Sequence, residues 1–166
     1  MKRCLFLCLV LAILLCLCSC SKTLHGTAAL VEKAREELPI ADAESIELRY
    51  AGQCVKDETA LVWFISGNEY QSHYYLPMEC EIIGEDAYKF ARTYKPIDRG
   101  GDIAVLQWQG GYAFCINNPE CALVRITDGT GTREERVEKN ACPYIFYNSL
   151  IPAEYLFLDS QGNEIS

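Results

Sequence analysis

Short apolar runs, separated by turn residues, follow one another along most of this chain. Thr59–Ser66 is almost continuously apolar, as in a strand buried on both faces. Met78, Cys80 and Ile82 alternate with glutamates, and this period of two is typical of a half-buried strand. Similar runs recur at 103–108, 112–116, 121–127, 143–147 and 155–158. The pattern predicts a mainly β fold bordering on α+β, with an antiparallel β-sandwich or barrel-like meander of about 8–10 strands over residues 44–158.

One segment before these strands has the period of a helix. Leu30 and Ala34 belong to an apolar stripe within residues 27–38, and charged residues lie outside that stripe. Pro39 ends the run, because proline cannot continue a helix. We therefore expect one N-terminal amphipathic helix at about 27–38.

Residues 86–95 fit two structures. Their apolar positions are compatible with a helix, for which Glu85 and Asp86 would suit the N-terminus. Tyr88 and Phe90 are strong β formers, so we favour a strand.

The first twenty residues have the organisation of an export signal. Two basic residues, Lys2 and Arg3, precede the uncharged apolar run Cys4–Cys18 of 15 residues. A membrane-spanning helix needs roughly 20 apolar residues. The shorter run suits the apolar region of a signal peptide, which spans about 7–15 residues.

The residues after this run, Leu17-Cys18-Ser19-Cys20, resemble the lipobox of bacterial lipoproteins. The resemblance implies cleavage before Cys20 and a diacylglyceryl thioether on its sulfur. Residues 1–19 would then be the signal peptide, 20–26 a lipid-anchored tether, and 27–166 a single β-rich domain on the outer side of the cell membrane. The alternative is ordinary cleavage near Ser19, which would release a soluble secreted protein.

Charge narrows the range of partners. The formal net charge is −8, and without residues 1–19 the remaining 13 basic and 23 acidic residues give −10. An acidic surface repels nucleic-acid phosphates, so we expect no nucleic-acid partner.

Five of the ten cysteines lie beyond the lipobox, and no two of these are spaced as CxxC. We therefore expect no metal site and no cofactor. Residues 112–116 and 121–126 are expected to form a hairpin. A three-residue loop would place Cys115 opposite Cys121, within reach of a disulfide, whereas a loop of two or four would place it opposite Ala122.

Histidine limits the catalytic options, because His73 is the only one beyond the tether. A small hydrolase would have to use His73 with Glu69 or Cys80. Glu79 and Glu81 share one strand face and would meet the spacing of a glycosidase acid pair. We interpret both as part of a solvated face, and His73 as a structural residue, so we expect no enzymatic activity.

Tyrosine content is the most distinctive feature of the composition. Its ring and hydroxyl suit packing on sugars or on partner proteins, and Tyr70, Tyr74 and Tyr75 form a candidate binding surface. The sequence favours a non-enzymatic envelope lipoprotein that binds a protein, peptide or glycan. A purely structural accessory of the envelope is the other non-enzymatic reading.

Overall fold

The computed structural model describes residues 22–39, 43–67, 73–98, 102–138 and 140–165. The expected signal peptide and the expected lipid site Cys20 lie outside these ranges. The elements in chain order are β1 Thr23–His25, α2 Gly26–Glu36, the 3-10 turn η1 Ala43–Ser45, β2 Leu48–Lys56, β3 Thr59–Ser66, β4 Tyr74–Gly84, β5 Ala87–Thr93, β6 Ile97–Asp98, β7 Ile103–Trp108, β8 Gly111–Ile116, β9 Leu123–Asp128, β10 Gly131–Arg136, β11 Tyr144–Asn148 and β12 Glu154–Leu158. The strand pairs are antiparallel, which confirms a mainly β fold.

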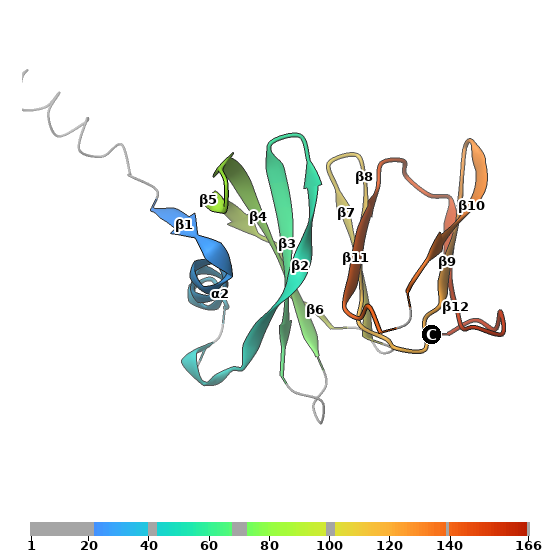
Figure 1. Ribbon diagram of the computed structural model, residues 1–166, viewed down its shortest axis with the longest axis horizontal. Helices are drawn as coiled ribbons and strands as arrows, with labels where there is room; N and C mark the ends of the chain where they lie inside the picture. The colour runs from blue at the N-terminus through green and yellow to red at the C-terminus, as the bar shows by residue number, and fades with distance from the viewer. Residues whose placement is uncertain (1–21, 40–42, 68–72, 99–101, 139, 166) are drawn as a thin grey trace, which may run out of the picture.

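The strands form three sheets stacked along the long axis of the molecule (Figure 1). The first sheet has the order β1-β5-β4-β3-β2, with β6 paired to β4. The middle sheet has the order β11-β8-β7, and the end sheet has the order β10-β9-β12. Within the described ranges no sheet closes on itself, so the barrel alternative is wrong for this part of the chain.

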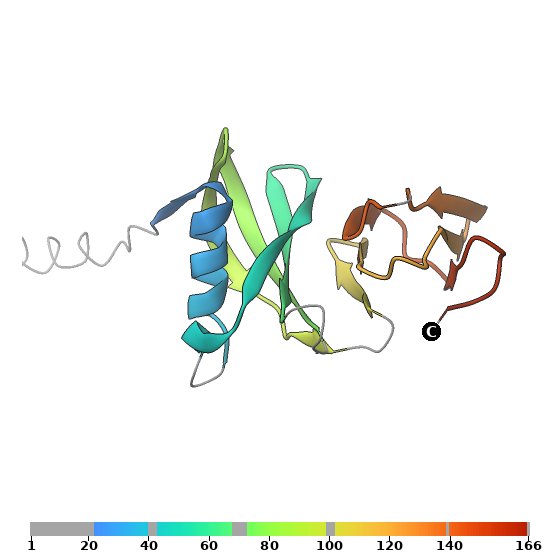
Figure 2. The same ribbon diagram turned by 60° about the horizontal axis from the view of Figure 1, so that its bottom comes forward.

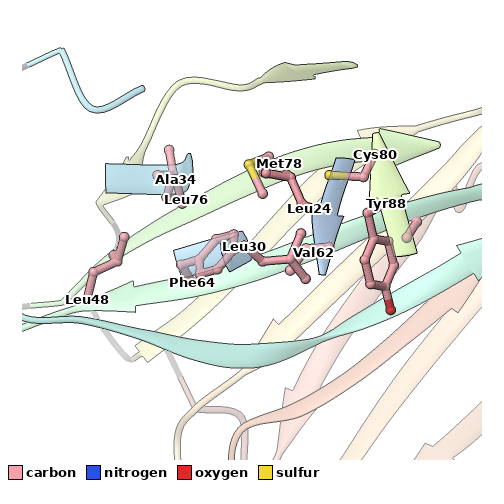
Figure 3. Packing of buried hydrophobic residues seen from close by; sticks show 11 residues of the cluster. Leu24, Leu30, Ala34, Leu48, Val62, Phe64, Leu76, Met78, Cys80 and Tyr88 are labelled. Carbon is pink, nitrogen blue, oxygen red and sulfur yellow. The ribbon is translucent and has the colours of Figure 1, made fainter. Parts of the chain in front are cut away.

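Helix α2 covers one face of the first sheet, and the two smaller sheets lie beyond its other face (Figure 2). Leu30 and Ala34 are the fully buried residues of α2. They pack in one cluster with Val62, Phe64 and Met78 of the sheet (Figure 3). The alternate residues Leu61, Trp63 and Ile65 of β3 face the middle sheet instead. The expectation that Thr59–Ser66 is buried on both faces is therefore confirmed.

Aromatic rings fill the space between the middle and end sheets. Phe114 of β8 stacks on Phe146 of β11 with ring centroids 4.6 Å apart, and Tyr155 of β12 meets Phe114 edge-on at 5.5 Å. Offset and edge-on pairs of this kind add to the free energy gained by burying the rings. Much of the tyrosine and phenylalanine content thus serves as core.

The ambiguous segment at 86–95 contains the strand β5, Ala87–Thr93, as favoured from the sequence. The expected hairpin between 112–116 and 121–126 is wrong. Strand β8 pairs with β7 and β11, whereas β9 pairs with β10 and β12. The residues between β8 and β9 therefore cross from the middle sheet to the end sheet.

Candidate functional site

The crossing segment between β8 and β9 helps to form a pocket at the end sheet. Ala122 N donates to Leu158 O at 2.9 Å, which holds the segment against the end of β12. Val137 N, just beyond β10, donates to Ala122 O at 3.0 Å. Three chain segments that are distant in sequence therefore converge here, and each is fixed by main-chain hydrogen bonds.

The pocket has a volume of about 420 Å³, within the range of about 300–1,000 Å³ usual for small-ligand sites. Apolar groups and the Cys121 thiol form one part of its lining, with Pro119, Ala122 and Val137. The polar part consists of Glu120, Asp159 and Ser160.

Asp159 contributes a stable negative charge to this pocket. Its Oδ1 accepts hydrogen bonds of 2.8 Å from Gln161 N and Asn163 N, and its Oδ2 accepts from Asn163 Nδ2 at 2.9 Å. These hydrogen bonds, from Asn163 above all, lower the pKa of Asp159. The carboxylate therefore stays ionised at neutral pH, and with Glu120 it gives the pocket an acidic rim.

A second polar group lies at the start of β4. His73 Nδ1 donates to Asp102 Oδ1 at 2.7 Å, and Tyr75 OH donates to the same oxygen at 3.0 Å. Burial, and then the Asp102 carboxylate, raise the pKa of Tyr75. Asn117 N donates to Asp102 O at 2.8 Å, so this group is attached to the same crossing segment as the pocket.

The structure does not bring His73 and Cys80 together. Cys80 lies seven residues farther along β4 and is fully buried in the cluster against α2. Burial raises the pKa of the Cys80 thiol to about 11, which disfavours the nucleophilic thiolate. Glu69 lies outside the described residues. The partner that the structure gives His73, Asp102, was not predicted, because the sequence there indicated only a turn.

The tyrosine surface is corrected in the same region. Tyr74 is 48% exposed, but the side chain of Tyr75 is fully buried and hydrogen-bonded to Asp102. Neighbouring residues on a strand point to opposite faces, so these two tyrosines cannot form one patch. Tyr70 lies outside the described residues.

The Cys115–Cys121 disulfide, one of the two alternatives for the predicted hairpin, is also corrected. Cys115 lies opposite Ala104 and Ile145, and it faces the first sheet. Cys121 belongs to the cluster between the middle and end sheets. Both are free thiols in the structure. Because the middle sheet separates their side chains, the Cys115–Cys121 disulfide has no geometric basis.

The expectation that Glu79 and Glu81 share a solvated face is wrong for Glu79. Its Oε2 accepts hydrogen bonds from Tyr94 OH at 2.7 Å, Trp108 Nε1 at 2.7 Å and Arg92 at 3.0 Å. The Glu79 side chain is only 12% exposed, whereas Glu81 is exposed. Glu79 is thus a link between the first and middle sheets.

No protein-family model, no curated protein and no solved structure matches this chain. Among the residues described, no helix has the length and apolar character needed to cross a bilayer. The same residues contain no group of three or more His, Cys, Asp or Glu side chains placed to hold a metal ion.

Proposed function

We propose that the chain is a membrane-anchored extracytoplasmic lipoprotein whose β domain binds a short peptide without catalysing a reaction. The anchor is the lipid on Cys20 expected from the LCSC sequence. The observation that carries the binding proposal is the pocket of about 420 Å³ at the end sheet. Figure 1 places the end sheet at the opposite end of the molecule from β1, and this strand, Thr23–His25, pairs with β5 and so corrects part of the expected tether at 20–26. A ligand site there would face away from the anchor.

The chemistry of the pocket favours a ligand that combines an aliphatic side chain with a positive charge. Ala122, Val137 and Pro119 offer apolar contacts, and Glu120 and Asp159 offer carboxylates on the rim. The net charge of −10 beyond residue 19 would draw cations toward the whole domain. A basic, aliphatic peptide suits both the apolar lining and the acidic rim of the pocket, whereas the rim would repel an anionic ligand.

Fluorescence anisotropy with two labelled tripeptides, Leu-Lys-Leu and Leu-Glu-Leu, tests this proposal. We expect the lysine peptide to bind, with an affinity that falls as salt rises, and the glutamate peptide to bind far more weakly. Glu120→Lys on the rim should weaken binding several-fold. Glu154→Lys, an exposed position of the end sheet away from the pocket, is the matched control. Equal binding of the two peptides, or equal losses in the two variants, would refute the proposal.

A small hydrolase is the second candidate, and one contact favours it. A carboxylate bound to His Nδ1 orients the ring in many hydrolases, and Asp102 bonds to His73 in this way. Tyr75 OH shares that carboxylate, so the same contact serves equally well to join β4 to the start of β7. We rank this candidate second because neither the geometry nor the pKa of Cys80 suits a nucleophile for His73.

A further inference from the structure

Two cysteines meet at one backbone oxygen beside the pocket. Asn118 O accepts a hydrogen bond from Cys121 N at 3.2 Å and another from Cys142 Sγ at 3.4 Å. The distance from the Cys142 sulfur to the Cys121 nitrogen is therefore at most the sum of these two distances. The cysteines are 21 positions apart in sequence, so the fold brings them together.

Main-chain hydrogen bonds hold both cysteine segments in place. Val137 N donates to Ala122 O at 3.0 Å, which fixes the chain after β10 beside the residue that follows Cys121. Ala141 N donates to Glu138 O at 3.0 Å, immediately before Cys142. The proximity of the two cysteines thus rests on several contacts besides the weak hydrogen bond of the thiol.

Cys121 and Cys142 differ from Cys115 in their location and in their exposure. Cys115 is fully buried on the far face of the middle sheet, Cys121 is 4% exposed, and Cys142 is half-buried. Burial raises the pKa of the Cys142 thiol. Burial also raises the pKa of Cys121, and the nearby charge of Cys142 raises it further. Cys142 is the more accessible thiol, and it shares the Asn118 O acceptor with the Cys121 main chain.

We propose that Cys121 and Cys142 form a disulfide when the protein meets a small disulfide oxidant such as oxidised glutathione. The Cys142 thiolate attacks one sulfur of the oxidant, forms a mixed disulfide and releases one glutathione thiolate. The Cys121 thiolate then attacks the Cys142 sulfur and releases the second. Two protein thiols become one disulfide, one oxidised glutathione becomes two glutathione thiols, and the two thiol protons pass to these products.

This disulfide would change the pocket, because Cys121 is part of its lining. The bond would join the crossing segment between β8 and β9 to the segment between β10 and β11. Disulfides persist in oxidising compartments, so the inference fits the extracytoplasmic location that we propose. Its formation does not require the peptide ligand, so this inference and the peptide proposal can fail separately.

The test uses the full-length chain in detergent, incubated with oxidised glutathione and then blocked with iodoacetamide. Cleavage with trypsin and a glutamate-specific protease separates Cys121, in peptide 121–125, from Cys115, in peptide 100–120. Cys142 falls in peptide 140–154. We expect mass spectrometry to show peptides 121–125 and 140–154 joined, with the loss of two hydrogen masses. Formation should be faster at alkaline pH, because the thiolate is the attacking species.

Two variants make the result specific. Cys142→Ser should abolish the joined peptides, and Cys115→Ala should retain them. The proposal is wrong if Cys142 stays as a glutathione adduct, if it joins peptide 100–120, or if the thiols remain free. The melting temperature gives an independent readout, since the bond should raise that of the wild type by several degrees and leave that of Cys142→Ser unchanged.

Discussion

Trp108 Nε1 donates a hydrogen bond of 2.7 Å to Glu79 Oε2 and so joins the middle sheet to the first sheet. Tyr94 OH and Arg92 donate to the same oxygen. A half-buried carboxylate is costly unless donors satisfy it, and here the donors come from two sheets. The packing of these sheets therefore depends on a charged group as well as on apolar contacts.

Removal of the indole donor should weaken this link. Trp108→Phe keeps a ring but loses the N–H, and we expect the free energy of unfolding to fall by about 1.5–3 kcal/mol, as for other hydrogen bonds to charged groups. Urea titration measures this change. Arg92→Ala is the control, because the Arg92 side chain is 60% exposed and its ion pair should contribute only about 0–1 kcal/mol. A larger loss in the control than in Trp108→Phe would contradict the interpretation.

Glu79 should also give stability a pH dependence. Burial alone would raise its pKa, but the hydrogen bonds from Tyr94, Trp108 and Arg92 outweigh burial, and the pKa is lowered from 4.5. The stabilisation is therefore present above pH 4.5 and is lost as the pH falls through the lower folded-state value. The difference in unfolding free energy between wild type and Glu79→Gln should shrink from pH 7 to pH 3. If this difference in unfolding free energy stays constant with pH, the loss of stability in Glu79→Gln comes from altered packing and not from the lost charge of Glu79.

Gly111, at the start of β8, and Gly129, in the turn between β9 and β10, should respond differently to alanine. A Cβ at Gly111 would overlap the backbone oxygen of Asn148 and come within 2.8 Å of the Tyr147 ring. Because the backbone cannot easily move aside, Gly111→Ala should cost about 1–3 kcal/mol or more. A Cβ at Gly129 meets nothing within 4 Å, so Gly129→Ala should stay within about 0.5 kcal/mol of wild type. Chemical denaturation of both variants compares them, and similar costs would contradict the packing of β11 on Gly111.

The proposed lipid anchor leads to a prediction about processing. The mass of the membrane-bound protein should correspond to a chain that begins at a diacylated Cys20. Cys20→Ala should be left unprocessed or released, because the modified sulfur is missing. If the variant is found processed and still membrane-bound, the lipoprotein proposal is wrong.

A His73 variant distinguishes the proposed binding function from the hydrolase alternative. We expect His73→Ala to leave affinity for the lysine tripeptide nearly unchanged, since His73 is not among the pocket-lining residues. A hydrolytic activity that fell by about a hundredfold or more in this variant would instead identify a general base. Asp102→Asn should then reduce that activity too.

Local pattern was sufficient for several elements. The apolar run Thr59–Ser66 predicts a strand that is buried on both faces. Tyr88 and Phe90 predict a strand at β5. The local pattern does not identify which strands pair. A hairpin and a crossing between two sheets both require alternating apolar and polar residues on either side of a short connecting segment. This is why the sequence predicts a hairpin of β8 with β9, with Cys121 or Ala122 opposite Cys115.

Long-range contacts determine the surroundings of the polar groups. Glu79 alternates with apolar residues as a solvent-facing acid would, yet its donors lie 13 to 29 positions away in the chain. The pocket likewise consists of three connections whose convergence no local pattern encodes. The aromatic content favoured core packing over an exposed binding surface. The structure places six of these rings in the cluster between the middle and end sheets: Tyr112, Phe114, Tyr144, Phe146, Tyr155 and Phe157.

The stack of layers also determines how far the domain would extend from the proposed lipid on Cys20. Packed sheets lie roughly 10 Å apart, so the spacings between α2 and the three sheets amount to about 30 Å. That length is similar to the thickness of a bilayer's hydrocarbon core, about 30 Å. With the lipid on Cys20 and the long axis upright, the end sheet would stand clear of the lipid head groups, where a peptide could approach it without touching the membrane.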